Sequence, residues 1–248
     1  MRARLLVSGI SAAVALAAVA LLVWISGASR APVETQQYVV APVVTPTPVV
    51  TPTATPTVAA PSYGPTIAQR WLTRTATRAG IPEVALRAYA RAQLMVPSSC
   101  KVGWTSLAGL GWVESQHGTV GGRTLGADGR PSTPILGPAL DGTSFGAMPA
   151  TAASTALDGD PTWQHAVGPM QFIASTWARW ASDGDGDGVA DPQDIDDAAY
   201  AAARYLCAGG YDLRTGSGWA HAIFSYNHTQ QYVDQVWAAA IAYAKRTS

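Results

Sequence analysis

From residue 66 to the C-terminus, hydrophobic residues recur at helical spacing rather than in alternation. Ile67, Trp71 and Leu72 fit one face of an amphipathic helix. Pro82 suits the first turn of a second helix, which Pro97 ends. The same spacing predicts further helices over residues 104–115, 170–181, 197–207 and 219–245, the last of them broken near Asn227. We therefore expect a mainly α-helical domain.

A glycine-rich stretch, residues 118–168, interrupts this helical pattern. Asp128-Gly129 and Asp141-Gly142 are turn signals, and residues 123–140 are long enough for a short hairpin. We expect a small β element there and loops elsewhere, so the fold class is mainly α (α+β). Because a loop this long within a compact domain usually has a function, we expect it to contribute to binding.

Residues 1–28 have the pattern of a signal peptide or a membrane anchor. Arg2 and Arg4 precede a run from Leu5 to Ile25 that contains no charged residue. This run matches the roughly 20 residues of a spanning helix and exceeds the roughly 7–15 of a signal-peptide core, which favours an anchor with the rest of the chain outside. The alternative is cleavage after the small residues 26–28 and secretion.

Residues 29–65 contain eight prolines among threonine, valine and alanine. Proline removes backbone donors and the segment has little to bury, so we expect a disordered linker of polyproline type, with a composition that also fits an O-glycosylated stalk. The working domain is therefore expected at residues 66–248.

The chain has two cysteines, Cys100 and Cys207. In an exported domain such a pair most simply forms a disulfide. The alternative is two free, buried thiols.

An acidic loop, residues 183–194, has the ligand spacing of an EF-hand calcium loop, with glycine at its sixth position. The expected ligands are Asp183, Asp185, Asp187, the carbonyl of Val189, and either Asp194 or Asp197 as the closing carboxylate. A structural Ca²⁺ is expected, because three aspartates at alternating positions repel one another without a cation. The alternative is a solvated acidic turn.

Glu114 is a candidate catalytic group because acids are scarce around it. Between residues 66 and 140 the only others are Glu83 and Asp128. Glu114 follows the apolar run 107–113, where burial would disfavour its charged form and raise its pKa. A general acid near neutral pH needs such a shift. The alternative is a glutamate in a structural hydrogen bond at a helix end.

Three ordered motifs resemble those of the lytic transglycosylases that cleave peptidoglycan. Glu114-Ser115-Gln116-His117-Gly118 resembles the family's Glu-Ser-x-x-Gly, residues 168–172 resemble Gly-x-Met-Gln-Phe, and Ser225-Tyr226-Asn227 resembles Ala-Tyr-Asn. The acidic loop lies between the second and third motifs, as in the membrane-bound lytic transglycosylase B type. The resemblance covers about residues 79–245.

The resemblance implies a lysozyme-like fold with Glu114 as the single catalytic acid and then base. The bond cleaved would be the β-1,4 bond between N-acetylmuramic acid and N-acetylglucosamine, with 1,6-anhydromuramoyl ends as products and no cofactor for catalysis. The matching cleft positions are Ser115, Met170, Gln171, Phe172, Tyr226 and Asn227, with Gln171 and Tyr226 as expected partners of Glu114 or the sugar. Most tryptophans stand at helical spacing and are expected in the core, with Trp163 in the loop as the better stacking candidate.

Two alternatives remain for the function. A muramidase would hydrolyse the same bond with a second carboxylate, for which Asp158 and Asp160 are the nearest candidates, although turn formation suits them better. A non-catalytic glycan-binding or scaffold module kept in place by calcium is the other. In each case we expect a monomer in the cell envelope, with peptidoglycan glycan strands as its partner and the membrane as a second one through the N-terminal segment.

The formal net charge is zero, with 16 basic and 16 acidic residues, and this balance excludes nucleic-acid binding through bulk charge. Residues 66–248 hold 13 of the basic and 15 of the acidic residues. Seven of these acids lie in or beside the acidic loop, so the rest of the domain is net basic, which suits a polyanionic wall polymer.

Overall fold

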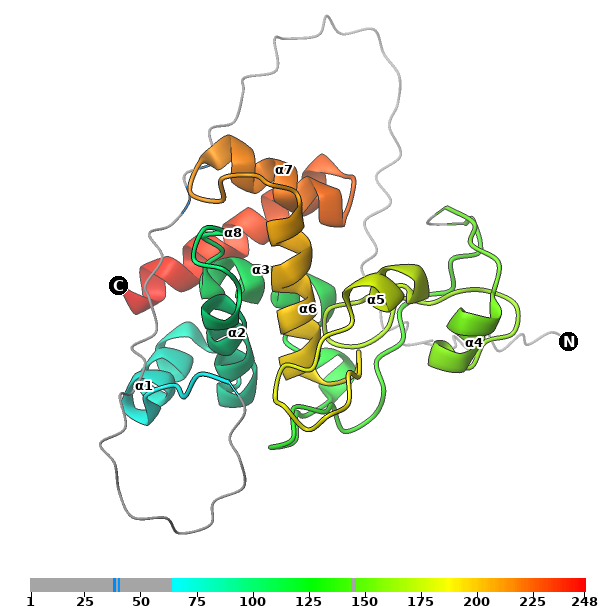
Figure 1. Cartoon of the computed structure of the whole chain (residues 1–248), viewed down its shortest axis with the longest axis horizontal. Coiled ribbons are helices and arrows are strands. Elements are labelled where there is room, and N and C mark those ends of the chain that lie inside the picture. Colours follow the sequence, from blue (N-terminus) through cyan, green and yellow to red (C-terminus); the bar gives the residue numbers. More distant parts are fainter. Residues whose placement is uncertain (1–37, 39, 41–63, 144–145) are drawn as a thin grey trace, which may run out of the picture. The chain divides into compact units, whose positions relative to one another are not determined.

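The computed structural model describes residues 38, 40, 64–143 and 146–248. Within this part of the chain it has eight α-helices and one short 3-10 helix, joined by loops (Figure 1). The helices are α1 (Gln69–Ala79), α2 (Glu83–Met95), α3 (Trp104–Ser115), η1 (Val120–Gly122), α4 (Ala152–Asp158), α5 (Ala174–Trp180), α6 (Ile195–Ala208), α7 (Gly216–Tyr226) and α8 (Gln230–Thr247). The mainly α-helical class is confirmed.

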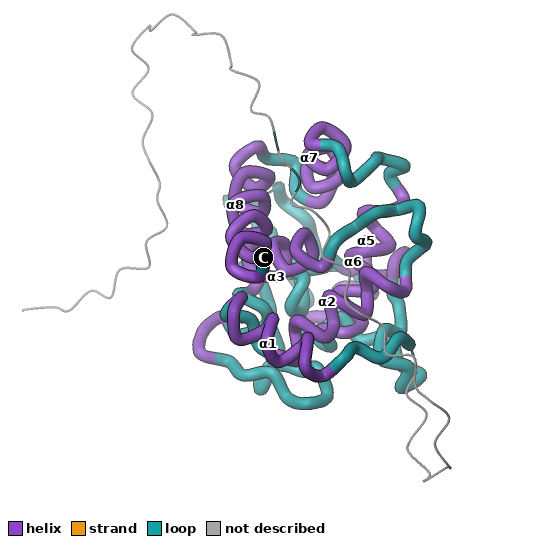
Figure 2. The backbone as a smooth tube through the Cα atoms, turned by 90° about the vertical axis from the view of Figure 1, so that its left-hand side faces the viewer, coloured by secondary structure: helices purple, strands orange, loops and turns teal. Residues whose placement is uncertain are grey.

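Helix α3 is almost wholly buried, and its first eight residues have no exposed member. It lies between α8 on one side and α2 with α6 on the other (Figure 2). Two glycines permit this approach. A Cβ on Gly109 would lie 2.7 Å from the carbonyl oxygen of Val236 on α8, and one on Gly111 would overlap the Tyr89 hydroxyl of α2. The packing therefore fixes the C-terminal end of α3, where Glu114 stands.

The predicted break near Asn227 separates α7 from α8. Asn227 has extended backbone dihedrals, and the hydroxyl of Thr229 accepts a hydrogen bond from the Tyr232 backbone N–H at 3.3 Å. This side-chain cap starts α8 two residues after the break. The cap also sets the direction in which the first turn of α8, with Tyr232, meets α3.

Helix α5 begins later than the predicted helix over residues 170–181. Gly168 (φ 76°) and Gln171 (φ 51°) adopt the left-handed conformation, and two backbone hydrogen bonds of 2.9 and 3.0 Å join Val167 to Phe172. Residues 168–172 therefore form a tight turn, which we call the GPMQF turn. Because the helical periodicity of the sequence continues through this turn, the sequence predicts a helix start at residue 170, whereas α5 begins at Ala174.

The small β element takes the form of isolated bridges in the part of the chain that the structure describes. Within the predicted hairpin, Leu125 pairs with Pro131, and the other bridges join Leu136 and Phe172 to Val167, and Pro149 to Trp163. Proline cannot donate to a strand ladder and glycine weakens a strand, so this region does not form longer strands. The region also contains α4, where the sequence predicts only a loop.

The disulfide between Cys100 and Cys207 is present, with a sequence separation of 107 residues. It joins the segment before α3 to the last turn of α6. The pairing predicted for an exported domain is confirmed, and the described residues contain no free cysteine.

Tyr38 lies within the predicted linker, yet it contacts the helical domain. Its hydroxyl donates a hydrogen bond of 2.6 Å to the Asp234 carboxylate, and its ring centroid lies 6.0 Å from both Trp219 and Trp237. Val40 also packs against the core. The remaining linker residues up to 63, and the predicted signal or anchor at residues 1–28, lie outside the described residues. Among the helices that the structure describes, none is long and apolar enough to cross a membrane.

We predict that replacing both Cys100 and Cys207 with serine lowers the free energy of unfolding by about 2–4 kcal/mol, because a cross-link over this many residues restricts the unfolded chain. Urea unfolding with and without reductant measures the loss. A matched control is Ser98→Ala with Ser217→Ala, which changes two exposed serines and leaves the bridge intact. Equal stability of the reduced and oxidised wild type would contradict the prediction.

Candidate active site

Glu114 stands near the C-terminal end of α3, half-buried, with its carboxylate against α8. The hydroxyl of Tyr232 donates a hydrogen bond to its Oε1 atom. Burial raises the pKa of Glu114 from 4.5 to about 7, and the hydrogen bond from Tyr232 opposes part of this rise. Close to neutral pH, the group is therefore poised to give up or take a proton.

Glu114 faces a cavity of about 390 Å³, which we call the first cavity. Three parts of the chain far apart in sequence form it: the end of α3, the glycine-rich loop with the GPMQF turn, and the tyrosines of α6, α7 and α8. The lining residues are Val113, Glu114, Pro138, Leu140, Ala166, Gln171, Phe172, Ile173, Thr176, Tyr205, Tyr226, Asn227 and Tyr232. Glu114 is the only carboxyl group among these lining residues.

Four of the six predicted substrate-binding residues line this cavity: Gln171, Phe172, Tyr226 and Asn227. The amide nitrogen of Gln171 donates to the Gly168 carbonyl at 2.9 Å, within the turn. The Tyr226 hydroxyl donates to the Met170 carbonyl at 2.8 Å. Both side chains bond to the backbone of the GPMQF turn rather than to Glu114, so of the two expected partners, Glu114 or the sugar, the sugar stays a prediction.

The other two predicted residues are absent from the lining of this cavity. The side chain of Met170 is fully buried. The Ser115 hydroxyl donates to the Pro169 carbonyl at 2.6 Å and accepts from the Gly118 backbone N–H at 2.7 Å. Ser115 thus ties the end of α3 to the GPMQF turn, which makes it a positioning residue in this structure.

Tyr232 and Tyr205 line this cavity, although no motif in the sequence marks them. Tyr232 bonds to Glu114 across 118 residues of chain. The rings of Tyr226 and Tyr232 are parallel, with centroids 6.5 Å apart, and the Tyr205 ring lies edge-on to Tyr226 at 5.3 Å. The sequence places Tyr232 shortly after Thr229, the residue that caps α8. Which face of α8 meets Glu114 depends on how α8 packs on α3.

The two candidates for a second carboxylate have structural partners instead. Asp158 accepts from the backbone N–H groups of Asp160 and His165, each at 2.9 Å. Asp160 accepts from the N–H groups of Thr162 and Trp163 at 2.6 and 3.1 Å. Neither aspartate lines the first cavity, so both shape the loop as turn-forming residues.

His165 holds this loop to the wall of the first cavity. Its Nδ1 atom lies 2.7 Å from the Gly137 carbonyl oxygen, and its Nε2 atom lies 3.1 Å from the Asp160 carboxylate. Both contacts need an N–H donor, so the protonated ring satisfies both together. The Gly137 carbonyl and the carboxylates of Asp158 and Asp160 raise the pKa of His165 accordingly. Pro138, which lines the cavity, follows this contact directly.

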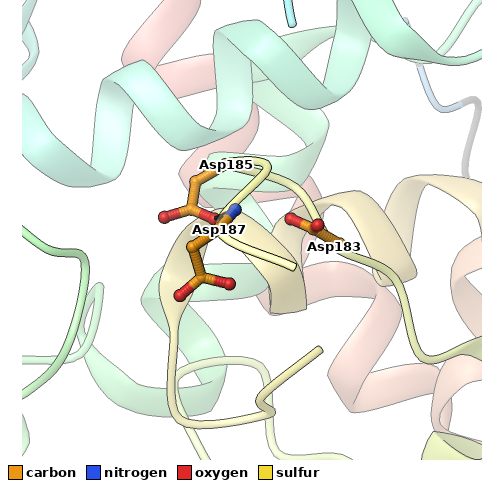
Figure 3. Close-up of side chains that lie close together, drawn as sticks. All are labelled: Asp183, Asp185 and Asp187. Carbon is orange, nitrogen blue, oxygen red and sulfur yellow. Dashed lines mark hydrogen bonds between the residues drawn. The ribbon is translucent and has the colours of Figure 1, made fainter. Parts of the chain in front are cut away.

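In the acidic loop, Asp183, Asp185 and Asp187 each offer an oxygen within 4.8 Å of the others (Figure 3). Asp187 also accepts from the Val189 backbone N–H at 2.7 Å, and the Val189 side chain is exposed. The structure thus brings together the first three of the predicted metal ligands.

The two closing candidates are buried and bonded to the backbone. Asp194 caps α6 by accepting from the Asp196 N–H at 2.8 Å, and Asp197 accepts from the N–H groups of Gly184 and Asp191 at 2.6 and 2.8 Å. Burial raises the pKa of Asp194 to about 7 and that of Asp197 to about 6. Asp197 therefore bridges both ends of the acidic loop.

We predict that Glu114→Gln makes the protein more stable than the wild type above pH 7. Because the folded-state pKa is raised, the folded protein binds more protons than the unfolded chain between pH 4.5 and 7, and wild-type stability falls as pH rises through this window. The neutral amide avoids this loss, which is worth up to about 3 kcal/mol. Urea unfolding at pH 4, 6 and 8 measures it, with Glu83→Gln as the matched control. A difference that does not change with pH would contradict the prediction.

Comparison with known families gives one match. A family model described as "Transglycosylase SLT domain" matches residues 150–240, which include the GPMQF turn, the acidic loop and the Tyr-Asn motif. No curated protein matches the chain.

Several solved structures are similar at low identity. The lytic transglycosylase Slt35 of Escherichia coli in complex with bulgecin A has 18% identity and a TM-score of 0.45, covering 72% of this chain and 75% of that one. A structure of the same enzyme in complex with calcium has 17% identity and a TM-score of 0.44, covering 72% and 76%. SltB3 of Pseudomonas aeruginosa in complex with NAG-anhNAM-pentapeptide has 14% identity and a TM-score of 0.43, covering 69% and 63%. The family match is the finding that supports a transglycosylase domain over residues 150–240.

Proposed function

We propose that this protein is a peptidoglycan lytic transglycosylase of the membrane-bound B type, which cleaves the β-1,4 bond between N-acetylmuramic acid and N-acetylglucosamine. The observation that carries the proposal is Glu114, a single buried carboxyl with a pKa of about 7 that faces a cavity and is held by Tyr232. The motifs around Glu114 and the family match downstream of it point to the same reaction.

In the proposed reaction, the Glu114 carboxylic acid donates its proton to the glycosidic oxygen, and the bond between that oxygen and C1 of the muramoyl residue breaks. The carboxylate then takes the proton from the 6-hydroxyl of the same residue as this oxygen attacks C1. The products are a 1,6-anhydromuramoyl end and a free 4-hydroxyl, and Glu114 returns to its acid form. The reaction consumes no water.

The absence of a second carboxyl from the described cavity lining favours this reaction over hydrolysis. A hydrolase places a second carboxylate about 5–10 Å from the acid, as nucleophile or as base for water. Asp158 and Asp160 use their oxygens on loop backbone and His165. An internal hydroxyl nucleophile needs no such group, because Glu114 itself is positioned to take its proton.

Tyr232 is proposed to orient Glu114. Its hydrogen bond fixes one oxygen of a carboxyl group that lines the first cavity. Because the bond favours the charged form, it also keeps the pKa of Glu114 from rising further, so that the carboxylate remains accessible as the base of the second step.

The acidic loop is proposed to bind a structural Ca²⁺. Asp183, Asp185 and Asp187 supply the carboxylate cluster, the Val189 carbonyl a fourth oxygen, and Asp194 or Asp197 the closing one. Hard carboxylate oxygens suit this hard cation. A Cβ on Gly168 of the GPMQF turn would overlap the Pro192 carbonyl oxygen, so the loop and the turn are in direct contact. An ordered loop would therefore support the wall of the first cavity.

The proposed setting is the outside of the cell. Residues 1–28 would export the chain and either anchor it or be removed, and residues 29–65 would hold the catalytic domain, residues 66–248, at the cell wall. Peptidoglycan glycan strands are the proposed partner of a monomeric enzyme. The net basic surface outside the acidic loop suits the polyanionic wall.

We predict that the purified wild-type protein releases anhydromuropeptides from cell-wall sacculi and that Glu114→Gln lowers the rate by at least about 100-fold, because it removes the acid. Mass spectrometry of the products distinguishes the reactions. The control Glu83→Gln keeps an equal charge change away from the cavity and should retain activity. Reducing muramic ends alone would favour a muramidase, and binding of sacculi without release would favour the scaffold module.

We predict that saturating Ca²⁺ stabilises the chelated protein by about 3 kcal/mol at 100 times the dissociation constant and that Asp185→Asn removes most of this gain. Thermal melting with calcium or chelator measures the shift. Asp212→Asn changes an exposed aspartate outside the acidic loop and serves as the control. No shift of the wild type at millimolar Ca²⁺ would contradict the site.

A further inference from the structure

Tyr38 comes from the predicted linker, yet it contacts both α7 and α8. Its ring centroid lies 6.0 Å from that of Trp219 on α7 and 6.0 Å from that of Trp237 on α8. Its carbonyl oxygen lies so close to Gly216, the first residue of α7, that a Cβ there would overlap it. Val40 packs against the core beside it in sequence. We call Tyr38 and Val40 the strap.

The hydroxyl of Tyr38 is bound by the start of α8. It donates a hydrogen bond of 2.6 Å to the Asp234 carboxylate and accepts one from the Gln230 amide. The same amide donates to the Asp234 carboxylate at 3.0 Å, so the three side chains bond to one another. Tyr232 lies between Gln230 and Asp234 in the sequence, and two residues correspond to about 200° around a helix. The strap therefore holds one side of this turn, while Tyr232 on the other side is buried and bonds to Glu114.

The strap also reaches α3, through Trp219. The indole of Trp219 is buried, and its Nε1 atom donates to the Ser106 hydroxyl of α3 at 2.9 Å. Helix α3 carries Glu114 and α8 carries Tyr232. The strap thus contacts α8 directly and α3 through one buried residue of α7, which are the two helices whose packing brings Tyr232 to Glu114.

We propose that Tyr38 is a positioning residue for Glu114: the strap holds the first turn of α8 in place and so keeps the Tyr232 hydroxyl on the Glu114 carboxyl. Tyr38 is absent from the lining of the first cavity, so it acts through Tyr232. Its part in catalysis rests on the proposed function, whereas its effect on the proton affinity of Glu114 does not. The working unit of the protein would then begin before residue 66.

The direction of the effect follows from the hydrogen bond. The bond from Tyr232 favours the charged form of Glu114 and opposes the rise of its pKa. Without the strap, the start of α8 is less constrained and this bond weakens, so Glu114 should titrate at a higher pH. The other titratable side chains in the cavity lining are Tyr226 on α7 and Tyr205 on α6. Phenols are neutral near pH 7, so these groups add no charge that would hide the shift.

The composition of the chain allows a direct test, because its only glutamates are Glu34, Glu83 and Glu114. Full-chain protein labelled with ¹³C at the glutamate carboxyl gives one NMR signal for each, and Glu83→Gln and Glu114→Gln assign them. The wild-type Glu114 signal should titrate with a midpoint of about 7. We expect Tyr38→Ala to raise this midpoint by about half to one pH unit, as for a weakened hydrogen bond to a charged group, and to leave that of Glu83 unchanged.

Three further variants locate the effect. Gly216→Ala displaces the Tyr38 carbonyl from the α7 side and should raise the midpoint as Tyr38→Ala does. Tyr232→Phe removes the bond to Glu114, and Tyr38→Ala added to it should cause no further shift. The control Tyr211→Ala removes an exposed tyrosine that stacks on His221 of α7, with centroids 5.5 Å apart, and should leave the midpoint unchanged.

The activity of the full chain provides the second readout. With glycan strands as substrate, Tyr38→Ala should lower kcat about fivefold, because the carboxyl is less well oriented, while KM stays within about twofold. The midpoint of the pH profile should rise together with the NMR midpoint of Glu114. Tyr38→Phe keeps the ring contacts and loses the hydroxyl, so its kcat should lie between those of the wild type and Tyr38→Ala.

Several results would overturn the inference. They are an unchanged Glu114 midpoint in Tyr38→Ala or in Gly216→Ala, an equal shift by Tyr38→Ala in the Tyr232→Phe background, and a parallel shift of Glu83. If Tyr38→Ala does not fold, Gly216→Ala and Tyr38→Phe decide in its place. If the midpoint rises as expected but the wild type releases nothing from sacculi, the proposed function fails and the positioning of Glu114 by Tyr38 stands. Release from sacculi without any midpoint shift in the variants overturns the inference and leaves the proposed function intact.

Discussion

The close packing of α3 between α2 and α8 places the Glu114 carboxyl where water reaches it poorly. Gly109 and Gly111 have no side chains at the two contacts, so the helices approach closely enough for α3 to be buried along most of its length. That burial raises the pKa of Glu114 to about 7, and Tyr232 on α8 limits the rise. A side chain at Gly109 would clash with the backbone of α8, and one at Gly111 would clash with Tyr89 of α2.

The GPMQF turn connects the other parts of the site to this packing. Its backbone accepts hydrogen bonds from Ser115 on α3 and from Tyr226 on α7, while Gly168 touches Pro192 of the acidic loop. The left-handed conformation of Gly168 permits this contact, because a Cβ there would overlap the loop. The acidic loop follows the turn by more than ten residues in sequence, yet it contacts the turn directly. The turn in turn lines the first cavity.

Polar side chains of the glycine-rich region form hydrogen bonds to groups within the same region. Asp158 and Asp160 bond to loop N–H groups, and His165 joins Asp160 to the Gly137 carbonyl beside the cavity wall. Glu114 is the only carboxyl among the described residues that line the first cavity. The fold thus separates carboxylates that shape the loop from the one that is free to exchange a proton.

The sequence by itself determined the helical class and Glu114 as the candidate acid, because helical periodicity and an acid after an apolar run are local signals. It also determined the Cys100–Cys207 pairing, because a chain with two cysteines offers only one. Only the tertiary structure decided that Tyr232 rather than Tyr226 bonds to Glu114, that the GPMQF turn delays α5, and that Trp112 stays exposed despite its helical spacing. The partner of Glu114 and the exposure of Trp112 depend on which faces of α3 and α8 meet. That choice is made by packing between segments more than 100 residues apart, and no local pattern in the sequence specifies it.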